Sequence, residues 1–392
     1  MDRPDRKIIK KHYPRENLDE RLSFTFEADP NLCLVKNKIQ IFFTIEVDEK
    51  YVPENGFAAK QFSCIDVELN SMLVSTTKTR GQYYMNDWLL KKINFTRDYL
   101  YSMFRIEGYF DDYNYEDLAD DDKIKIAKTR RSGCLLKDKK YIYQLCMIPT
   151  DAFLLDNKPL PPNLEMKLTL NRQNKKFSCI NTGEADLFPA PFVLKDCYAN
   201  VEYISSSNLR QYLDPKRPIS YKYDELKMIT RVLPRGERRL RIENLAGGNT
   251  PEYLFVGLIE TGLLGGDDKK ESINFLQHGA IQFDLLLNGS SCNGYPMAIQ
   301  SQYPLKPYLK YQDVLGNILN TKSPMVDSIF DFKKALLYAH EFQGDIEDEN
   351  GWISVAIDFK EPVDSNLSIV LWTVDMVRIA IDEYGQIEKM LL

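Results

Sequence analysis

Histidines are the side chains best suited to proton transfer or metal binding near neutral pH, and this chain of 392 residues has three of them. They are His12, His278 and His340, and none lies in sequence beside a partner that would complete a catalytic triad or a zinc site. The GxSxG, GxGxxG and phosphate-binding GxxxxGK motifs are missing as well. We therefore nominate no catalytic residue, no metal ligand and no cofactor, and we expect a protein that is not an enzyme. A triad of residues distant in sequence stays open.

The seven cysteines do not form a recognisable metal or disulfide pattern. Their number is odd and no two have CxxC spacing. Several lie inside apolar segments, such as Cys146 in YIYQLCMIP and Cys179 in FSCI. We interpret them as reduced core residues of a protein made in a reducing compartment.

A cluster of arginines between residues 231 and 244 could bind a negatively charged partner. Its guanidinium groups suit carboxylates of a neighbouring subunit, or phosphates. Equally, the charges could protect an exposed strand edge from unwanted pairing. The net charge of −6 favours a subunit contact over nucleic acid. The residues that we nominate for a subunit interface are Arg235, Arg238, Arg239 and Arg241, together with the helical segment around Trp88.

Two segments of the chain carry charge mainly of one sign: the N-terminal segment is basic and a later segment is acidic. Residues 1–20 are basic and without periodicity, and we predict a solvated tail, with an arm that contacts an acidic partner as the alternative. We expect no direct contact with nucleic acid except through this tail. The same residues lack the apolar core of a secretion signal, so we do not expect secretion. The most apolar runs, YLFVGLIETGLLGG and SIVLWTVDMVRIAI, are too short or too interrupted to span a bilayer, so we expect no membrane span. Residues 108–123 are acidic, lack EF-hand spacing and are predicted to form a loop.

Most of the chain shows the sequence pattern of β-strands, and these strands must position any functional surface. In residues 164–171, for example, Leu164, Met166, Leu168 and Leu170 alternate with polar residues, which is typical of a half-buried strand. A polar break leads from there to a short strand at 177–180. Predicted strands span 22–28, 38–49, 62–75 with a turn at Asn70–Ser71, 141–149, 164–172, 177–181, 192–205, 227–234, 237–244, 253–261, 280–289, 352–359, 365–375 and 376–387. Helical signals span 84–104, 205–213, 303–319 and 326–341.

This order of elements is not the strand–helix alternation of a parallel α/β sheet. Aromatic residues make up 12% of the chain, and flat rings pack well on pleated faces. We therefore predict an all-β fold of antiparallel sandwiches, and the length suits two in tandem. The predicted units are the basic tail at 1–20, a first sandwich at 21–204 and a second at 205–392.

Several phrases spread from Ser63 to Ile387 resemble one protein family. They are IDVELNSMLVS followed by YMNDWLLKKINFTRDYLYSMFRIEGYFDDYN, then PLPPNLEMKLTLNRQNKKFSCI, YLFVGLIETGLLGG, NFLQHGAIQFDLLLNG and SVAIDFKEPVDSNLSIVLWTVDMVRIAIDEYGQI. Together, in this order, they are similar to segments of the major capsid proteins of Polinton (Maverick) elements and adintoviruses.

The resemblance implies a double jelly-roll, which is two eight-stranded antiparallel sandwiches in one chain. It also implies a structural subunit that forms homotrimers, which act as pseudo-hexagonal capsomers in an icosahedral virion. Its partners would be neighbouring capsomers and a minor or penton capsid protein. It leaves open whether the gene belongs to an active virus or to a host-resident element.

Two other functions remain open at this point. A minor or penton capsid protein would have a single jelly-roll, which the length and the second set of strands disfavour. A jelly-roll carbohydrate-binding protein or glycan-processing enzyme would need an aromatic and acidic cleft, for which Trp352, Glu347 and Asp345 are the candidates.

Overall fold

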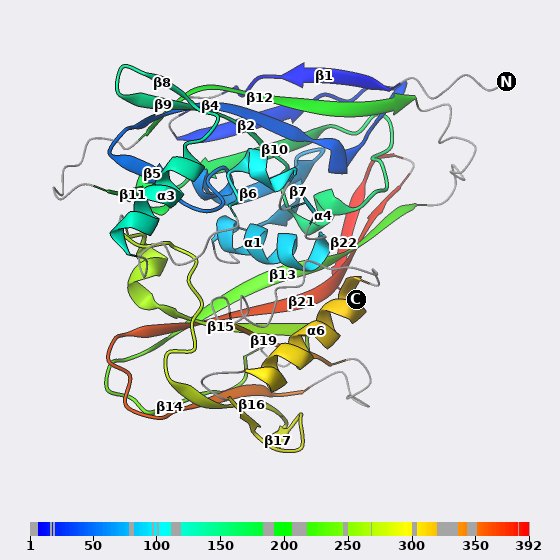
Figure 1. The fold of residues 1–392 in the computed structure, drawn as a ribbon. Coiled ribbons are helices and arrows are strands. Elements are labelled where there is room, and N and C mark those ends of the chain that lie inside the picture. Colours follow the sequence, from blue (N-terminus) through cyan, green and yellow to red (C-terminus); the bar gives the residue numbers. More distant parts are fainter. Residues whose placement is uncertain are drawn as a thin grey trace.

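The computed structural model describes residues 7–15, 18, 20–77, 82–95, 98–99, 102–110, 119–182, 192–205, 218–245, 250–267, 269–299, 304–319, 336–342, 351–382 and 384–391. Strands dominate these residues, and Figure 1 shows them as two stacked groups with helix α1 (Tyr83–Asn94) between them. Strands β1 to β12 form one group, and strands β13 to β22 form the other.

The first group contains two facing sheets. One has the order β1-β12-β4-β9-β8, with β3 also pairing with β12, and the other has the order β2-β10-β6-β7. A small sheet pairs β11 with β5. The strand bounds are β1 Ile8–His12, β2 Arg21–Phe26, β3 Leu32–Leu34, β4 Gln40–Asp48, β5 Tyr51–Pro53, β6 Phe62–Leu69, β7 Met72–Thr76, β8 Leu135–Lys137, β9 Lys140–Met147, β10 Met166–Arg172, β11 Cys179–Asn181 and β12 Phe192–Ser205.

The second group repeats this plan. Its sheets have the orders β13-β21-β15-β19, with β22 pairing with β21, and β14-β20-β16-β17, with β18 pairing with β16. The strand bounds are β13 Ile219–Leu233, β14 Arg239–Ile242, β15 Tyr253–Glu260, β16 Ala280–Leu287, β17 Ser290–Ser291, β18 Met297–Ala298, β19 Leu337–Glu341, β20 Ile353–Phe359, β21 Leu367–Ile381 and β22 Ile387–Leu391.

The two groups share one topology. Numbering the eight principal strands of each group in chain order (β1, β2, β4, β6, β7, β9, β10 and β12, then β13 to β17 and β19 to β21) gives sheets 1-8-3-6 and 2-7-4-5 in both. All these pairs are antiparallel. Every connection crosses from one sheet to the other except the hairpin between the fourth and fifth strands, which is the jelly-roll arrangement. We call the groups the first and second jelly-roll. The predicted all-β, double jelly-roll fold is confirmed.

Side-chain alternation explains why these segments form strands. In β4 every second residue of QIFFTIEVD is buried between the two sheets. The hairpin between β6 and β7 turns at Asn70 and Ser71, both of which have positive φ angles, as predicted for this dipeptide. The predicted strand pair at 164–180 is more complicated, because β10 pairs with β2 and β6 whereas β11 pairs with β5.

The helices are excursions from the strands. Besides α1, they are α3 Asp120–Arg130, α4 Ala152–Leu155 and α6 Leu305–Leu319, with 3-10 turns η1 Lys36–Lys38, η2 Ala59–Gln61, η3 Phe104–Glu107, η5 Lys175–Phe177 and η6 Thr261–Gly265. The predicted loop at 108–123 is therefore wrong at its end, where Asp120 to Asp122 begin α3. Acidic residues in a first turn stabilise a helix N-terminus.

Three other predictions need correction. Ile8–His12 form edge strand β1 on β12, so these residues belong to a sheet and not to a solvated tail. The strands predicted at 365–375 and 376–387 are one strand, β21, up to Ile381, because Asp375 and Met376 both continue the ladder with β13. Leu337–Glu341 form strand β19 and not the end of a helix, because they pair with β15. The helix predicted at 205–213 lies outside the described residues.

The boundary predicted at 204/205 falls at the last residue of β12. The division of the chain into units at 21–204 and 205–392 stays a prediction.

Candidate assembly site: the junction and the outer sheet faces

An aromatic cluster joins the two jelly-rolls within the chain. Trp88 of α1 packs on Phe275 with ring centroids 5.3 Å apart, and Phe275 meets Trp372 of β21 edge-on at 5.5 Å. The Asn86 Oδ1 accepts a 3.0 Å hydrogen bond from the indole Nε1 of Trp372. Because this hydrogen bond satisfies the only polar atom of a buried indole, it fixes the orientation of α1 on the sheet.

The cluster lies on the outer face of the sheet that contains β21. Trp372 pairs directly with Met228 of β13 and with Phe255 of β15, so these three side chains share one face. The opposite face is the interior of the second jelly-roll, where Tyr338 of β19 stacks on Phe283 of β16 at 4.2 Å. The first jelly-roll therefore covers an outer sheet face of the second.

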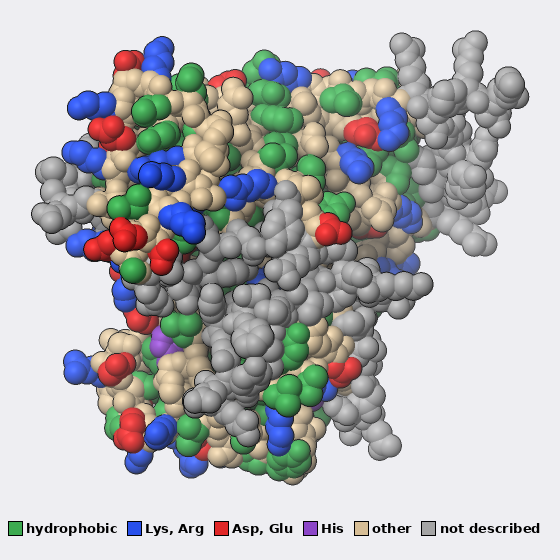
Figure 2. Space-filling view, in the orientation of Figure 1, with side chains coloured by type: hydrophobic (Ala, Val, Ile, Leu, Met, Phe, Trp, Pro, Cys, Tyr) green, Lys and Arg blue, Asp and Glu red, His purple; other side chains and the backbone are tan. Residues whose placement is uncertain are grey.

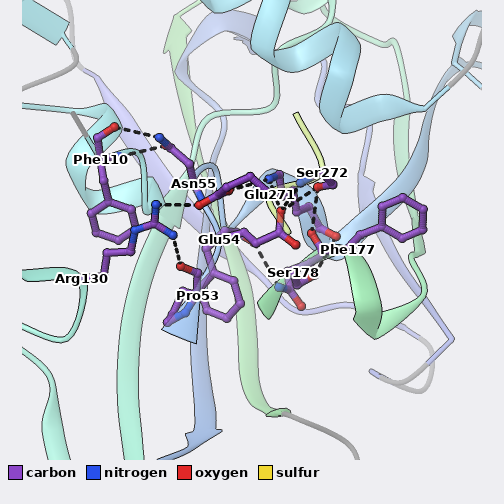
Figure 3. A network of polar contacts seen from close by, with 12 residues as sticks. Pro53, Glu54, Asn55, Phe110, Arg130, Phe177, Ser178, Glu271 and Ser272 are labelled. Atoms are coloured by element: carbon purple, nitrogen blue, oxygen red, sulfur yellow. Dashed lines mark hydrogen bonds and ion pairs between the residues drawn. The ribbon is translucent and has the colours of Figure 1, made fainter. Parts of the chain in front are cut away.

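A buried ionic network, shown in Figure 3, crosses the same junction. Arg130 of α3 contacts the Glu271 carboxylate at 2.6 Å and donates a 2.9 Å hydrogen bond to the Pro53 carbonyl. Lys60 of η2 contacts Glu54 at 2.6 Å. The Glu54 Oε2 also accepts hydrogen bonds of 2.8 Å from the Ser272 amide and 2.7 Å from its hydroxyl. Two cations and one carboxylate of the first jelly-roll thus hold a loop of the second.

The pKa values of the two carboxylates in this network shift in opposite directions. Burial raises the pKa of Glu54 to about 7, against the opposing effect of the Lys60 charge. The Oε1 of Glu54 has no hydrogen-bond partner among the described residues. Burial also acts to raise the pKa of Glu271, but the charges of Arg130 and Lys60 outweigh it, so that this pKa is lowered. Glu271 is therefore the stable anion of the network and Glu54 is its titrating member.

A second network anchors α1 to the first jelly-roll. Lys91 contacts Asp87 at 2.8 Å and also pairs with Glu107 of η3. The Asp87 carboxylate accepts hydrogen bonds from the hydroxyls of Tyr109, at 2.7 Å, and Thr150. Burial raises the pKa of Glu107 to about 7, against the opposing charge of Lys91. These groups are engaged in holding the helix, an arrangement suited to rigidity.

The predicted interface residues lie in different places. Trp88 is only 5% exposed, and its ring is used inside the chain, so its burial argues against a role in subunit contacts. The arginines are exposed: Arg239 and Arg241 lie on the edge strand β14, and Arg235 and Arg238 precede it. Arg239 pairs with Asp358 on the neighbouring strand. This placement fits the strand-protection interpretation, and a subunit contact through these arginines stays a prediction.

Of the three candidates for a carbohydrate cleft, Trp352 alone lies in the described part of the chain. Trp352 is 70% exposed before β20, and Asp345 and Glu347 lie outside the described residues.

Five of the seven cysteines are buried, as expected of core residues. Within the described ranges, no three His, Cys, Asp or Glu side chains are placed to hold a metal ion. No described helix is long and apolar enough to cross a bilayer.

Sequence reasoning missed an aromatic surface on the first jelly-roll. Tyr198 of β12 stacks on Phe42 of β4 with centroids 4.9 Å apart, and Tyr13 lies 6.2 Å from Tyr198. We call these three residues the aromatic stripe. The Nζ of Lys11 lies 3.7 Å from the centre of the Tyr198 ring. The signal in the sequence was the alternation that places Phe42 and Tyr198 opposite the buried residues of their strands, but only the register brings them together.

Charges on the face drawn in Figure 2 are mixed. Lys and Arg side chains of the described residues are interspersed with Asp and Glu over both jelly-rolls. This distribution differs from the continuous basic surface that binding along nucleic acid requires.

No protein-family model and no curated protein sequence matches the chain. Solved structures do match. A cryo-EM structure of the Sputnik virophage superposes with a TM-score of 0.66 at 10% identity, over 98% of this chain and 88% of that chain. The mavirus major capsid protein superposes with a TM-score of 0.56 at 10% identity, over 98% of this chain and 90% of that chain. The capsid of the virus PBCV-1 superposes with a TM-score of 0.57 at 11% identity, over 99% of this chain and 98% of that chain. The chain therefore has the double jelly-roll fold of these viral major capsid proteins.

Proposed function

We propose that the protein is a major capsid protein, a structural subunit that assembles into a viral or virus-like shell. The observation that carries this proposal is the presence of two complete jelly-rolls of identical topology in one chain, held together by a buried junction. A rigid pair of similar units is suited to tiling, because each copy presents the same two building blocks at a fixed angle. The likeness to capsid proteins over nearly the whole chain supports it.

The finer features follow from the same reasoning. Three copies with two jelly-rolls each would form a homotrimer of pseudo-hexagonal outline, which packs in a plane and contacts neighbouring capsomers and a minor or penton protein. Such a trimer closes through heterologous contacts that return on themselves. The phrases from Ser63 to Ile387 support a relationship to the capsid proteins of Polinton elements and adintoviruses. The protein acts in the virion and has no enzymatic step.

The test is the molar mass of the purified protein by light scattering, with negative-stain electron microscopy of the same fraction. We expect trimers of hexagonal outline, or larger shells. A monomer that does not assemble over a range of salt and protein concentrations would refute the proposal. A sugar-dependent rise in thermal stability would then favour a carbohydrate-binding protein.

A further inference from the structure

The repeated topology allows each surface of one jelly-roll to be compared with its counterpart on the other. In the second jelly-roll the first, eighth and third principal strands are β13, β21 and β15, and their outer face carries Met228, Trp372 and Phe255 in direct register. All three side chains are buried. They are buried because α1 and Phe275 lie on this face.

The same three strands of the first jelly-roll are β1, β12 and β4, and their outer face carries the aromatic stripe. Here the aromatic side chains remain accessible. Tyr13 is 59% exposed, and Phe42 and Tyr198 are half-buried. The stripe thus lies on the face of the first jelly-roll that corresponds by topology to the covered face of the second jelly-roll. In the single chain, the stripe itself is open to solvent.

The elements that could cover these faces also correspond. Helix α1 lies between the fifth and sixth strands of the first jelly-roll, and α6 lies between the fifth and sixth strands of the second. Every residue of α1 from Tyr83 to Ile93 is buried. In α6, by contrast, Leu305 and Leu309 are 50% and 57% exposed, one turn apart on one side of the helix. Two leucines exposed side by side on a helix are suited to a contact that the single chain does not make.

We propose that the aromatic stripe is the surface on which a second copy of this chain docks, with the second jelly-roll of that copy presenting Leu305 and Leu309 of α6. The inference rests on the proposed function and specifies which surfaces form its subunit contact. The contact is heterologous, so each copy uses its stripe toward one neighbour and its α6 toward the other. Repeated three times, it would give a closed ring in which jelly-rolls alternate around the axis.

The charges around the stripe favour a protein over nucleic acid. Aromatic rings beside a lysine can also stack the bases of a single strand. However, this sheet face carries Glu46 and Glu202, which pair with Lys195 at 3.2 Å and Lys7 at 3.1 Å. A surface with its charges already balanced lacks the excess of cations that phosphates require, whereas it suits an apolar helix side.

The test begins with charge substitutions on each side of the contact. Tyr198→Asp and Leu309→Asp should each convert the trimer to monomer in light scattering, at protein concentrations where the unsubstituted protein is trimeric. Ile124→Asp is the matched control, because Ile124 is 55% exposed on helix α3, and it should leave the trimer intact. Far-UV circular dichroism spectra, which should be unchanged, show that the variants are folded.

A photo-crosslinker provides the second measurement. Benzoylphenylalanine at position 309, in a mixture of isotopically light and heavy copies, should give light–heavy crosslinks to peptides containing Tyr13, Phe42 or Tyr198. Crosslinks to other segments, or trimers that persist in both charge variants, would overturn this inference and leave the proposed function standing. If the unsubstituted protein is monomeric, the proposed function itself fails. Loss of oligothymidine binding in a Tyr198→Asp trimer would instead assign the stripe to nucleic acid.

Discussion

Replacing Glu271 by Gln should destabilise the protein strongly, because Glu271 is the anion on which the junction depends. Its carboxylate contacts Arg130 at 2.6 Å and Lys60 at 3.7 Å, and the side chains of both cations are almost completely buried. Glutamine has the same size and keeps one oxygen acceptor, but it removes the charge. Arg130 then remains buried without the carboxylate charge that it faces, although it keeps its hydrogen bond to the Pro53 carbonyl and its place 5.3 Å from the centre of the Phe110 ring.

Removing one member of a buried ion pair costs about 3–5 kcal/mol, since the remaining charge is left without compensation. We expect the lower end, about 3 kcal/mol, because Lys60 keeps Glu54. With a urea dependence of about 3 kcal/mol per molar, the midpoint of unfolding should fall by about 1 M. Intrinsic fluorescence is a suitable assay, because two of the three tryptophans, Trp88 and Trp372, are buried at the junction.

Glu260→Gln is the matched control. Glu260 contacts Lys270 at 2.7 Å, but both side chains are about two-fifths exposed. An exposed pair contributes less than about 1 kcal/mol, so the urea midpoint should move by only a few tenths molar. Equal shifts in the two variants would refute the argument that burial, and not the ion pair as such, makes Glu271 important.

Other outcomes follow from the same contacts. Between about pH 4.5 and 7 the folded state holds a proton on Glu54 that the unfolded state has lost. The contribution of this group to the free energy of unfolding is therefore full below pH 4.5 and declines as the pH rises to 7. In Glu54→Gln, the free energy of unfolding should depend less on pH across this window. Asn86→Ala leaves the Trp372 indole without its acceptor and should cost about 1–3 kcal/mol in urea unfolding, whereas an unchanged midpoint would show that the bond contributes nothing. Deleting residues 1–13 removes β1 and should lower the thermal midpoint, and an unchanged midpoint would restore the interpretation of this segment as a tail.

Local patterns predicted the strands better than their connections. The alternation in β4 and the Asn70–Ser71 turn are properties of a few adjacent residues, so they are visible in the sequence. Segment 326–341 shows the limit. Its apolar spacing indicates a helix, yet Leu337–Glu341 pair with Tyr253–Gly257, and a ladder partner some 80 positions away overrides local preference.

The candidate site was harder to predict, because its residues meet only in the folded chain. Ser272 and Glu54 are 218 positions apart in sequence, and neither has a neighbour that marks it as part of a network. Trp88 was nominated for a subunit interface, but its described ring partner, Phe275, belongs to the same chain. Exposed arginines stand out in a sequence, whereas a buried ion pair is no more visible than any other charged residue.

The residue types on the two corresponding sheet faces differ. The difference follows from the step at which each face is covered, which is chain folding for the second jelly-roll and subunit docking for the first. Met228, Trp372 and Phe255 are covered once, as the chain folds, and can be almost wholly apolar. Tyr13, Tyr198 and Phe42 must remain soluble in a free subunit until a partner arrives. Tyrosine hydroxyls and the Lys11 ammonium over the Tyr198 ring keep such a surface hydrated, while the ring faces remain available for packing. If the stripe were only an ordinary solvated sheet face, nothing would explain why aromatic rings lie on the eighth and third principal strands of both jelly-rolls. These rings are Tyr198 and Phe42 in the first jelly-roll and Trp372 and Phe255 in the second.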